Sequence, residues 1–131
     1  MANQFLGHIA LVVDDYDEAI DFYVNKLGFE LVEDTVLDEQ KRWVIVAPKG
    51  NGSCNLLLSK AVGDEQKSRV GNQTGGRVFL FLYTEDFEGD YQRLVHHQIK
   101  IVRPRRKEIY GEVLVFEDLY GNLWDLIKPR C

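Results

Sequence analysis

An internal repeat is the feature of this sequence that most constrains its fold. A short segment near the N-terminus recurs 69 residues later, so that Gly7, His8, Ile9, Leu11 and Val13 match Gly76, Arg77, Val78, Leu80 and Leu82. Later segments match at an offset of 70, with Val44, Ile45, Val46, Leu56 and Leu57 facing Leu114, Val115, Phe116, Leu126 and Ile127. A pattern of about sixty residues that occurs twice indicates two copies of one supersecondary unit. The copies open on different polar residues, a histidine in the first and an arginine in the second.

The first copy is predicted to have the element order βαβββ. Aliphatic and β-branched residues predict a strand over residues 5–13. Asp14 and Asp15 can cap a helix whose apolar residues recur at helical spacing as far as Leu27, and Gly28 stands where a left-handed cap is expected. Three strands are then predicted, over residues 29–36, 42–47 and 54–59, with residues 48–52 as the last turn.

The second copy is predicted to repeat that order after a polar linker at residues 61–75, which shows no periodicity. A strand is predicted at 77–83, a helix capped by Thr84 follows, and His96 and His97 lie at its end. Further strands are predicted at 99–103, 112–116 and 122–128. The basic residues Arg103, Arg105, Arg106 and Lys107 could bind an anion, although a solvated loop is the simpler explanation. Residues 104–111 are predicted to form a loop that could also close over a ligand.

Composition excludes several classes of protein. A chain of 131 residues with 45% hydrophobic residues can build one compact domain. Its formal net charge of −5 argues against a nucleic-acid partner. Two cysteines, Cys54 and Cys131, form no disulfide framework, and no stretch has the length of a signal peptide's apolar region or a membrane span. We therefore expect a cytoplasmic protein with neither nucleic acid nor membrane as a partner.

Motifs at both ends of the chain resemble one known superfamily. They are GHIALVV at residues 7–13, AIDFY at 19–23, LGF at 27–29 and FEDLYGNLWDL at 116–126. Together these motifs resemble the vicinal oxygen chelate superfamily, which contains glyoxalase I, extradiol dioxygenases, fosfomycin-resistance enzymes and bleomycin-resistance proteins. The resemblance implies an α+β fold in which tandem βαβββ modules form curved, incomplete-barrel sheets. It implies one domain over residues 1–131, with modules at about 1–60 and 76–131 joined by a linker at 61–75, and a homodimer.

The resemblance also implies where a site would lie. Members that use a metal draw ligands from the first and last strands of the modules, and these positions carry His8, Arg77 and Asp125 here. The fourth position is either Asn55 or Leu56, depending on how the repeats are aligned. A divalent zinc, iron or manganese ion prefers imidazole and carboxylate ligands, so His8 and Asp125 are the candidate metal ligands and catalytic residues. The permanent charge of Arg77 would oppose a cation beside it.

Metal-free alternatives remain open for the same residues. Arg77 could form a buried pair with Asp125, or it could hold an anionic substrate group while His8 acts as an acid or base. A hydrogen-bonded core role explains His8 equally well. Substrate-binding candidates are Arg77, Trp43, Asn55 and Tyr110. Trp124 alternates with Asp125 along its strand, which predicts a core or dimer position for its indole.

Two functions follow as expectations from the resemblance. The first is a glyoxalase-type lyase or isomerase that acts on a small polar organic molecule, assisted by a divalent metal with an incomplete set of ligands or by proton transfer. The alternative is a non-catalytic protein that sequesters a toxin or antibiotic. A pocket that has lost both activities is the third possibility.

Overall fold

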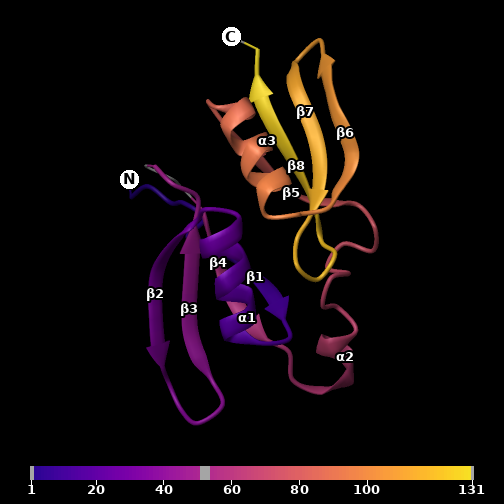
Figure 1. Cartoon of the computed structure of the whole chain (residues 1–131). Coiled ribbons are helices and arrows are strands. Elements are labelled where there is room, and N and C mark those ends of the chain that lie inside the picture. Colours follow the sequence, from indigo (N-terminus) through magenta and orange to yellow (C-terminus); the bar gives the residue numbers. More distant parts are fainter. Residues whose placement is uncertain (1, 51–53, 131) are drawn as a thin grey trace. The chain divides into compact units, whose positions relative to one another are not determined.

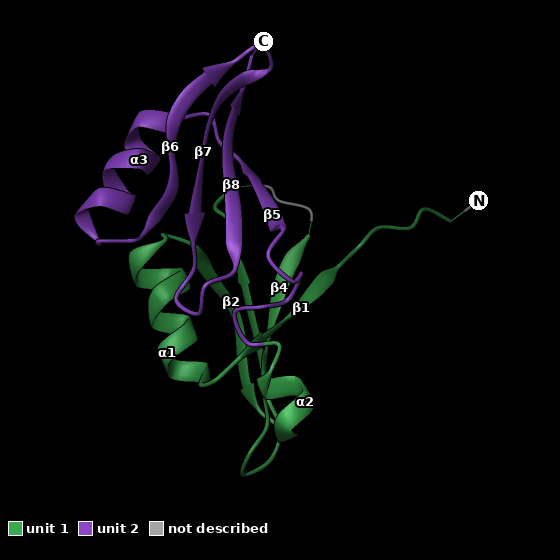
Figure 2. Cartoon of the chain, turned by 90° about the vertical axis from the view of Figure 1, so that its right-hand side faces the viewer, with its two compact units in different colours: residues 1–69 green, residues 70–131 purple. Residues whose placement is uncertain are grey.

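The chain forms two compact units, residues 1–69 and 70–131 (Figure 2). The computed structural model describes residues 2–50 and 54–130. The turn predicted at 48–52 therefore lies partly outside the described residues, and so does Cys131. The boundary between the units falls inside the linker that the sequence predicts.

Unit 1 is a mixed four-stranded sheet with a helix packed on it (Figure 1). Its strands have the order β1-β4-β3-β2, in which β1 and β4 are parallel and the other neighbours are antiparallel. Its elements are β1 (His8–Val13), α1 (Tyr16–Ile20), the π-helix η1 (Asp21–Lys26), β2 (Glu30–Val36), β3 (Arg42–Ala47), β4 (Asn55–Lys60) and α2 (Gly63–Lys67).

Helix α1 begins and continues for reasons visible in the sequence. The carboxylate of Asp15 accepts a hydrogen bond from the amide of Glu18 at 2.8 Å, which caps the helix as predicted. The last turn widens to a π-helix because the Leu27 amide donates to the carbonyl of Phe22, five residues back. Gly28 then ends the helix with a φ of 89°, the left-handed conformation that glycine adopts without strain.

Unit 2 repeats this topology. Its strand order is β5-β8-β7-β6, again with a parallel first pair, β5 and β8. Its elements are β5 (Val78–Tyr83), α3 (Phe87–His96), β6 (Ile101–Glu108), β7 (Gly111–Glu117) and β8 (Leu123–Pro129). Both units thus have the order βαβββ, and the prediction of an α+β fold with open sheets is confirmed.

Three local predictions are wrong. The linker contains a short helix, α2, where no periodicity predicted one. The cap of α3 is Asp86, whose carboxylate accepts from the amide of Gly89 at 3.0 Å, whereas the Thr84 hydroxyl accepts from the amide of Asp86. The loop predicted at 104–111 is largely strand, because β6 runs to Glu108 and pairs with β7. His96 does end α3, as predicted.

The cores of the units lie between each sheet and its helix. In unit 2, Trp124 stacks on Phe116 at a ring distance of 5.9 Å and is almost fully buried, which confirms its core position. A buried carboxylate fixes the β7–β8 turn: Asp118 accepts from the amides of Tyr120, Gly121 and Asn122. In the part of the chain that the structure describes, no helix has the length and apolar character that a bilayer crossing requires.

Candidate functional site

Each sheet has a face turned away from its helix, and these faces carry the predicted site residues. Side chains alternate along a strand, and in β1 the buried Leu11 and Val13 are on the helix side. His8 therefore belongs to the other face. In β3 the side chain of Arg42 contacts α1, so its neighbour Trp43 is also on the far side of the sheet. We call this surface, with His8, Trp43 and Asn55, the open face of unit 1.

Three predicted residues lie on the open face of unit 1. The rings of His8 and Trp43 are 6.1 Å apart between centroids and inclined at 79°, an edge-to-face arrangement. Asn55 is the direct strand partner of His8 in the parallel ladder of β1 and β4. His8 is exposed, and Trp43 and Asn55 are half-buried. The surface thus offers two flat rings and a primary amide beside them.

The open face of unit 2 is organised in two transverse rows. The strand pairings place Phe81, Asp125, Val115 and Arg103 in the first row, and Tyr83, Ile127, Val113 and Arg106 in the second. Phe81 and Tyr83 are 57% and 63% exposed, which is unusual for aromatic side chains in a strand. Neither residue was predicted as part of the site, although their alternation with Leu80 and Leu82 along β5 was a usable signal.

Asp125 has an unusual environment on this face. Its Oδ1 atom is buried and has no hydrogen-bond partner in the described structure. Burial raises the pKa of Asp125, and the positive charges of Arg106 and Arg103 partly oppose that rise. The structure therefore gives Asp125 two cationic neighbours that the sequence analysis did not foresee.

Arg77 and Tyr110 lie outside the strands of unit 2. Arg77 directly precedes β5 and is exposed, and its carbonyl accepts from the hydroxyl of Thr74 at 2.5 Å. Among the ion pairs of the described residues, none joins Arg77 to Asp125. Tyr110 is in the turn between β6 and β7, where its carbonyl accepts from the amide of Arg130 at 2.9 Å.

The ladders also show which positions of the two units correspond. Val44 and Leu114 are matched positions of the repeat, and they pair with Leu58 and Leu126 respectively, so Leu58 corresponds to Leu126. The residue before each lies on the open face, and Leu57 therefore corresponds to Asp125. Neither Asn55 nor Leu56 is the counterpart of Asp125 in this register. In the parallel ladders, the counterpart of the His8–Asn55 pair is the pair of Val78 with Leu123.

The residues around each candidate ligand do not fit a metal site within either unit. Among the described residues, no three His, Cys, Asp or Glu side chains gather as a metal site would require. His8 meets an indole and an amide, and Asp125 has two guanidinium groups as its charged neighbours. Guanidinium groups oppose a cation, and an indole cannot coordinate one.

The sequence is similar to known proteins over nearly its whole length. The family model for the Glyoxalase/Bleomycin resistance protein/Dioxygenase superfamily matches residues 5–126. An uncharacterized protein of Shewanella frigidimarina (strain NCIMB 400) is 61% identical over 126 residues, which cover 95% of this chain and 93% of that protein.

Two solved structures are similar over nearly the whole chain. UcmS2 is 29% identical with a TM-score of 0.82, and the match covers 96% of this chain and 98% of UcmS2. TnmS3, an antibiotic binding protein from Streptomyces sp. CB03234, is 28% identical with a TM-score of 0.78, covering 99% of each chain.

Proposed function

This chain belongs to the Glyoxalase/Bleomycin resistance protein/Dioxygenase superfamily, and on that premise we propose that it binds a small, flat organic molecule without converting it. The observation that carries the proposal is the ring pair of His8 and Trp43 on the open face of unit 1. The likeness to TnmS3, described as an antibiotic binding protein, supports binding as the task. The proposal includes the homodimer that the resemblance implies and the cytoplasmic location that the composition predicts, and sedimentation of the purified protein tests the oligomeric state.

The ring pair suits a flat ligand for physical reasons. The half-buried indole of Trp43 offers a large apolar surface, and aromatic rings that pack against it gain a stacking or edge-to-face energy beyond the burial of area. The exposed imidazole of His8 is near that surface and Asn55 is the strand partner of His8, so both can orient polar groups of the ligand. A surface with aromatic rings and few polar groups favours binding over chemistry.

We prefer sequestration to metal-assisted catalysis because the groups around His8 and Asp125 do not complete a metal site. The two candidate ligands, His8 and Asp125, have neighbours in their own units that cannot share a metal ion.

Proton transfer is the second candidate function, and Asp125 favours it. A carboxyl group whose pKa is raised by burial is a better proton donor and acceptor near neutral pH than an ordinary aspartate. In that case Asp125 would exchange a proton with a bound substrate. The replacement Asp125→Asn would then abolish turnover while sparing ligand binding, and the acidic limb of the pH profile would report the raised pKa.

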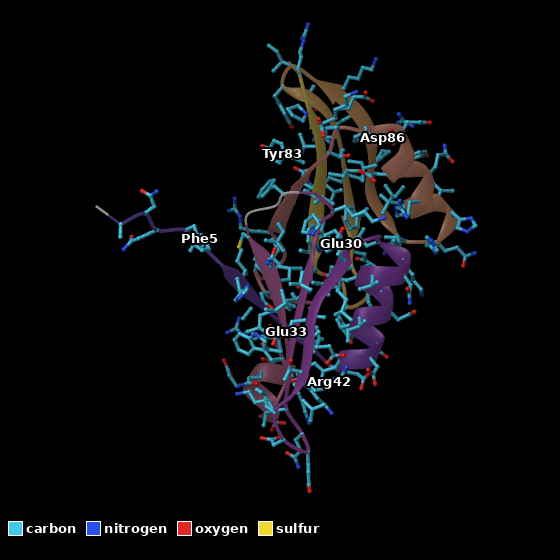
Figure 3. The ribbon with its side chains drawn as sticks, turned by 90° about the vertical axis from the view of Figure 1, so that its left-hand side faces the viewer. Phe5, Glu30, Glu33, Arg42, Tyr83 and Asp86 are labelled. Carbon is cyan, nitrogen blue, oxygen red and sulfur yellow. The ribbon has the colours of Figure 1, made fainter. Side chains whose placement is uncertain are left out.

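Calorimetric titration tests the binding proposal with 2-naphthamide, a neutral flat molecule. The variant Trp43→Ala is expected to weaken binding about tenfold, because it removes the aromatic wall. Phe5→Ala is the matched control, since Phe5 is an exposed aromatic residue that precedes β1 (Figure 3).

The outcomes separate cleanly. Absence of naphthamide binding, or equal affinity of the wild type and Trp43→Ala for naphthamide, would overturn the proposal. Mass spectrometry of the recovered probe is expected to show it unchanged, and a converted product would favour the enzyme instead.

A further inference from the structure

A groove lies at the end of the unit 1 sheet, next to the open face. It has a volume of about 470 Å³. Trp43, Leu57 and Ser59 line it from the strands, Tyr16 from α1 and Gln66 from α2, together with Asp38, Gln40, Lys41, Arg42, Leu58, Lys60 and Val62. All of these residues belong to unit 1. We call it the end groove; Figure 3 labels Arg42 in this region of the sheet.

The charges that line the end groove differ from those of the chain as a whole. The chain is acidic, with 21 Asp and Glu residues against 16 Lys and Arg residues. The groove instead has three cationic side chains, Lys41, Arg42 and Lys60, and a single carboxylate, Asp38. One oxygen of that carboxylate already accepts from the amides of Gln40 and Lys41, at 2.8 Å each.

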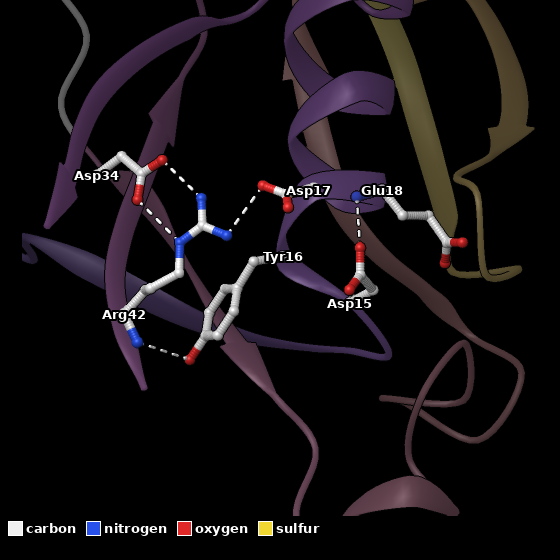
Figure 4. A network of polar contacts seen from close by, with 6 residues as sticks. All are labelled: Asp15, Tyr16, Asp17, Glu18, Asp34 and Arg42. Carbon is white, nitrogen blue, oxygen red and sulfur yellow. Dashed lines mark hydrogen bonds and ion pairs between the residues drawn. The ribbon is translucent and has the colours of Figure 1, made fainter. Parts of the chain in front are cut away.

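Arg42 is committed to other partners. Its guanidinium forms a two-bond fork with Asp34, at 3.0 and 2.6 Å, and a third bond to Asp17 at 2.9 Å (Figure 4). These bonds raise the pKa of Arg42 above its usual value. Since two carboxylates compensate its charge, Arg42 stiffens the wall of the groove and contributes little net attraction for an anion.

The two lysines are the uncompensated cations. Among the ion pairs and side-chain hydrogen bonds of the described residues, none involves the ammonium group of Lys41 or Lys60. Both are exposed and line the groove, Lys41 directly before β3 and Lys60 at the end of β4. An anion between them would interact with two positive charges.

Neutral groups of the groove suit the same ligand. The hydroxyl of Tyr16 accepts from the amide of Arg42 at 3.3 Å, which leaves its own hydrogen available to an acceptor in the groove. Trp43 lines the groove and also packs against His8 on the open face. A ligand that lies on the indole can therefore extend into the groove.

We propose that the end groove binds the acidic group, a carboxylate, sulfonate or phosphate, of a flat ligand whose ring lies on Trp43. The proposal rests on the proposed function, because it assigns the ligand class to the same aromatic wall. Lys41 and Lys60 bind the anion, and Tyr16 donates a hydrogen bond to it. The protein is thereby selective for acidic aromatic molecules over their neutral counterparts.

The test compares 2-naphthoate with 2-naphthamide, two probes of the same shape that differ in charge. Wild-type protein is expected to bind the naphthoate about tenfold more tightly. The double variant Lys41→Met/Lys60→Met removes the two charges and is expected to eliminate that preference while leaving naphthamide affinity unchanged. Lys49→Met is the matched control, since Lys49 follows the opposite end of β3. Raising the salt from about 20 mM to about 300 mM is expected to weaken only naphthoate binding.

The results distinguish the two proposals. Equal affinity of wild-type protein for both probes, or an unchanged preference in the double variant, overturns the acidic-group proposal and leaves aromatic binding intact. If the wild type does not bind naphthamide, the proposed function is overturned. Naphthoate binding that the double variant loses would then show that the groove binds the anion without the aromatic wall. A double variant that binds neither probe, although its circular dichroism spectrum is unchanged, contradicts the charge argument.

Discussion

Replacing Asp125 by leucine is expected to stabilise the protein, and this prediction tests how the structure explains the candidate site. Asp125 is half-buried on the open face of unit 2, and its Oδ1 atom has no hydrogen-bond partner in the described structure. The corresponding position of unit 1 already holds a leucine, Leu57, between the same kinds of strand neighbours. The change Asp125→Leu therefore gives unit 2 the residue that its own repeat tolerates.

The magnitude follows from the state of the carboxylate. A buried polar group without a hydrogen bond costs about 1–3 kcal/mol, and burying leucine atoms in its place adds a favourable transfer energy. Attraction to Arg103 and Arg106 offsets part of that cost. We expect Asp125→Leu to raise the free energy of unfolding by about 1–2 kcal/mol at pH 7.

The raised pKa of Asp125 predicts how the stability gain from Asp125→Leu changes with pH. Burial raises the pKa of Asp125, so the folded state binds this proton more tightly than the unfolded state does. The contribution of Asp125 to stability is therefore greatest below the ordinary aspartate value of about 3.9 and is lost as the pH rises through the higher folded-state pKa. The gain from Asp125→Leu is accordingly larger at pH 7 than near pH 4.

Urea denaturation at both pH values measures this, with Asp125→Asn as the control. The amide variant is neutral at all pH values, so it is expected to recover the pH-dependent part of the gain only. A leucine variant less stable than wild type at pH 7, or a gain that does not shrink towards pH 4, would refute the account of a desolvated carboxylate.

Three further predictions concern other features. Arg42→Met is expected to lower the free energy of unfolding by about 1–2 kcal/mol, because it breaks the half-buried fork with Asp34. Asp17→Asn is expected to lower it by no more than about 0.5 kcal/mol, because Asp17 is 81% exposed. Equal losses in urea denaturation would contradict this ranking. Gly71→Ala is expected to lower the melting temperature by roughly 5–10 °C, since the residue has a φ of 73° and an added Cβ would overlap the carbonyl of Tyr120; an unchanged midpoint in calorimetry would rule that contact out. Dialysis against a chelator is expected to leave probe affinity and melting temperature unchanged, and recovery of either by added zinc or manganese would restore the metal hypothesis.

The fold was predictable because the repeat and the strand patterns agree. The bounds predicted for β3 match those of the structure, and the order βαβββ is confirmed in both units. A strand that buries one or both faces needs apolar residues that alternate or cluster in a short run, and this pattern can be recognised in the sequence.

Strand β6 shows where such patterns fail. Its sequence contains Pro104 and a run of basic residues, which is typical of a loop. At the edge of a sheet, however, a strand can be polar and can contain proline, because one of its sides pairs with no neighbour. Pairing with β7 therefore decides the structure of this segment, and that information is not local.

Individual residues of the candidate site could be predicted from the sequence, but their arrangement in space could not. His8, Trp43 and Asn55 come from three strands. The ring pair of His8 and Trp43 and the pairing of His8 with Asn55 depend on the order β1-β4-β3 and on the register of each strand pair. The cationic neighbours of Asp125 depend on irregularities of register in β6 between residues 101 and 106, which place Arg103 and Arg106 on its face. A side-chain period of two cannot reveal such shifts.

Unequal divergence of the repeats explains why a sequence offset misplaces corresponding residues. The register of the β5–β8 ladder shifts between Val78 and Leu80, whereas no such shift interrupts the β1–β4 ladder. One extra residue in a strand reverses the face of every residue beyond it, so residues matched by offset need not share a surface. Unit 1 consequently has aromatic rings and an amide on its open face, and unit 2 has a carboxylate with two arginines. The chemistry of each face therefore follows from the register of its own strands.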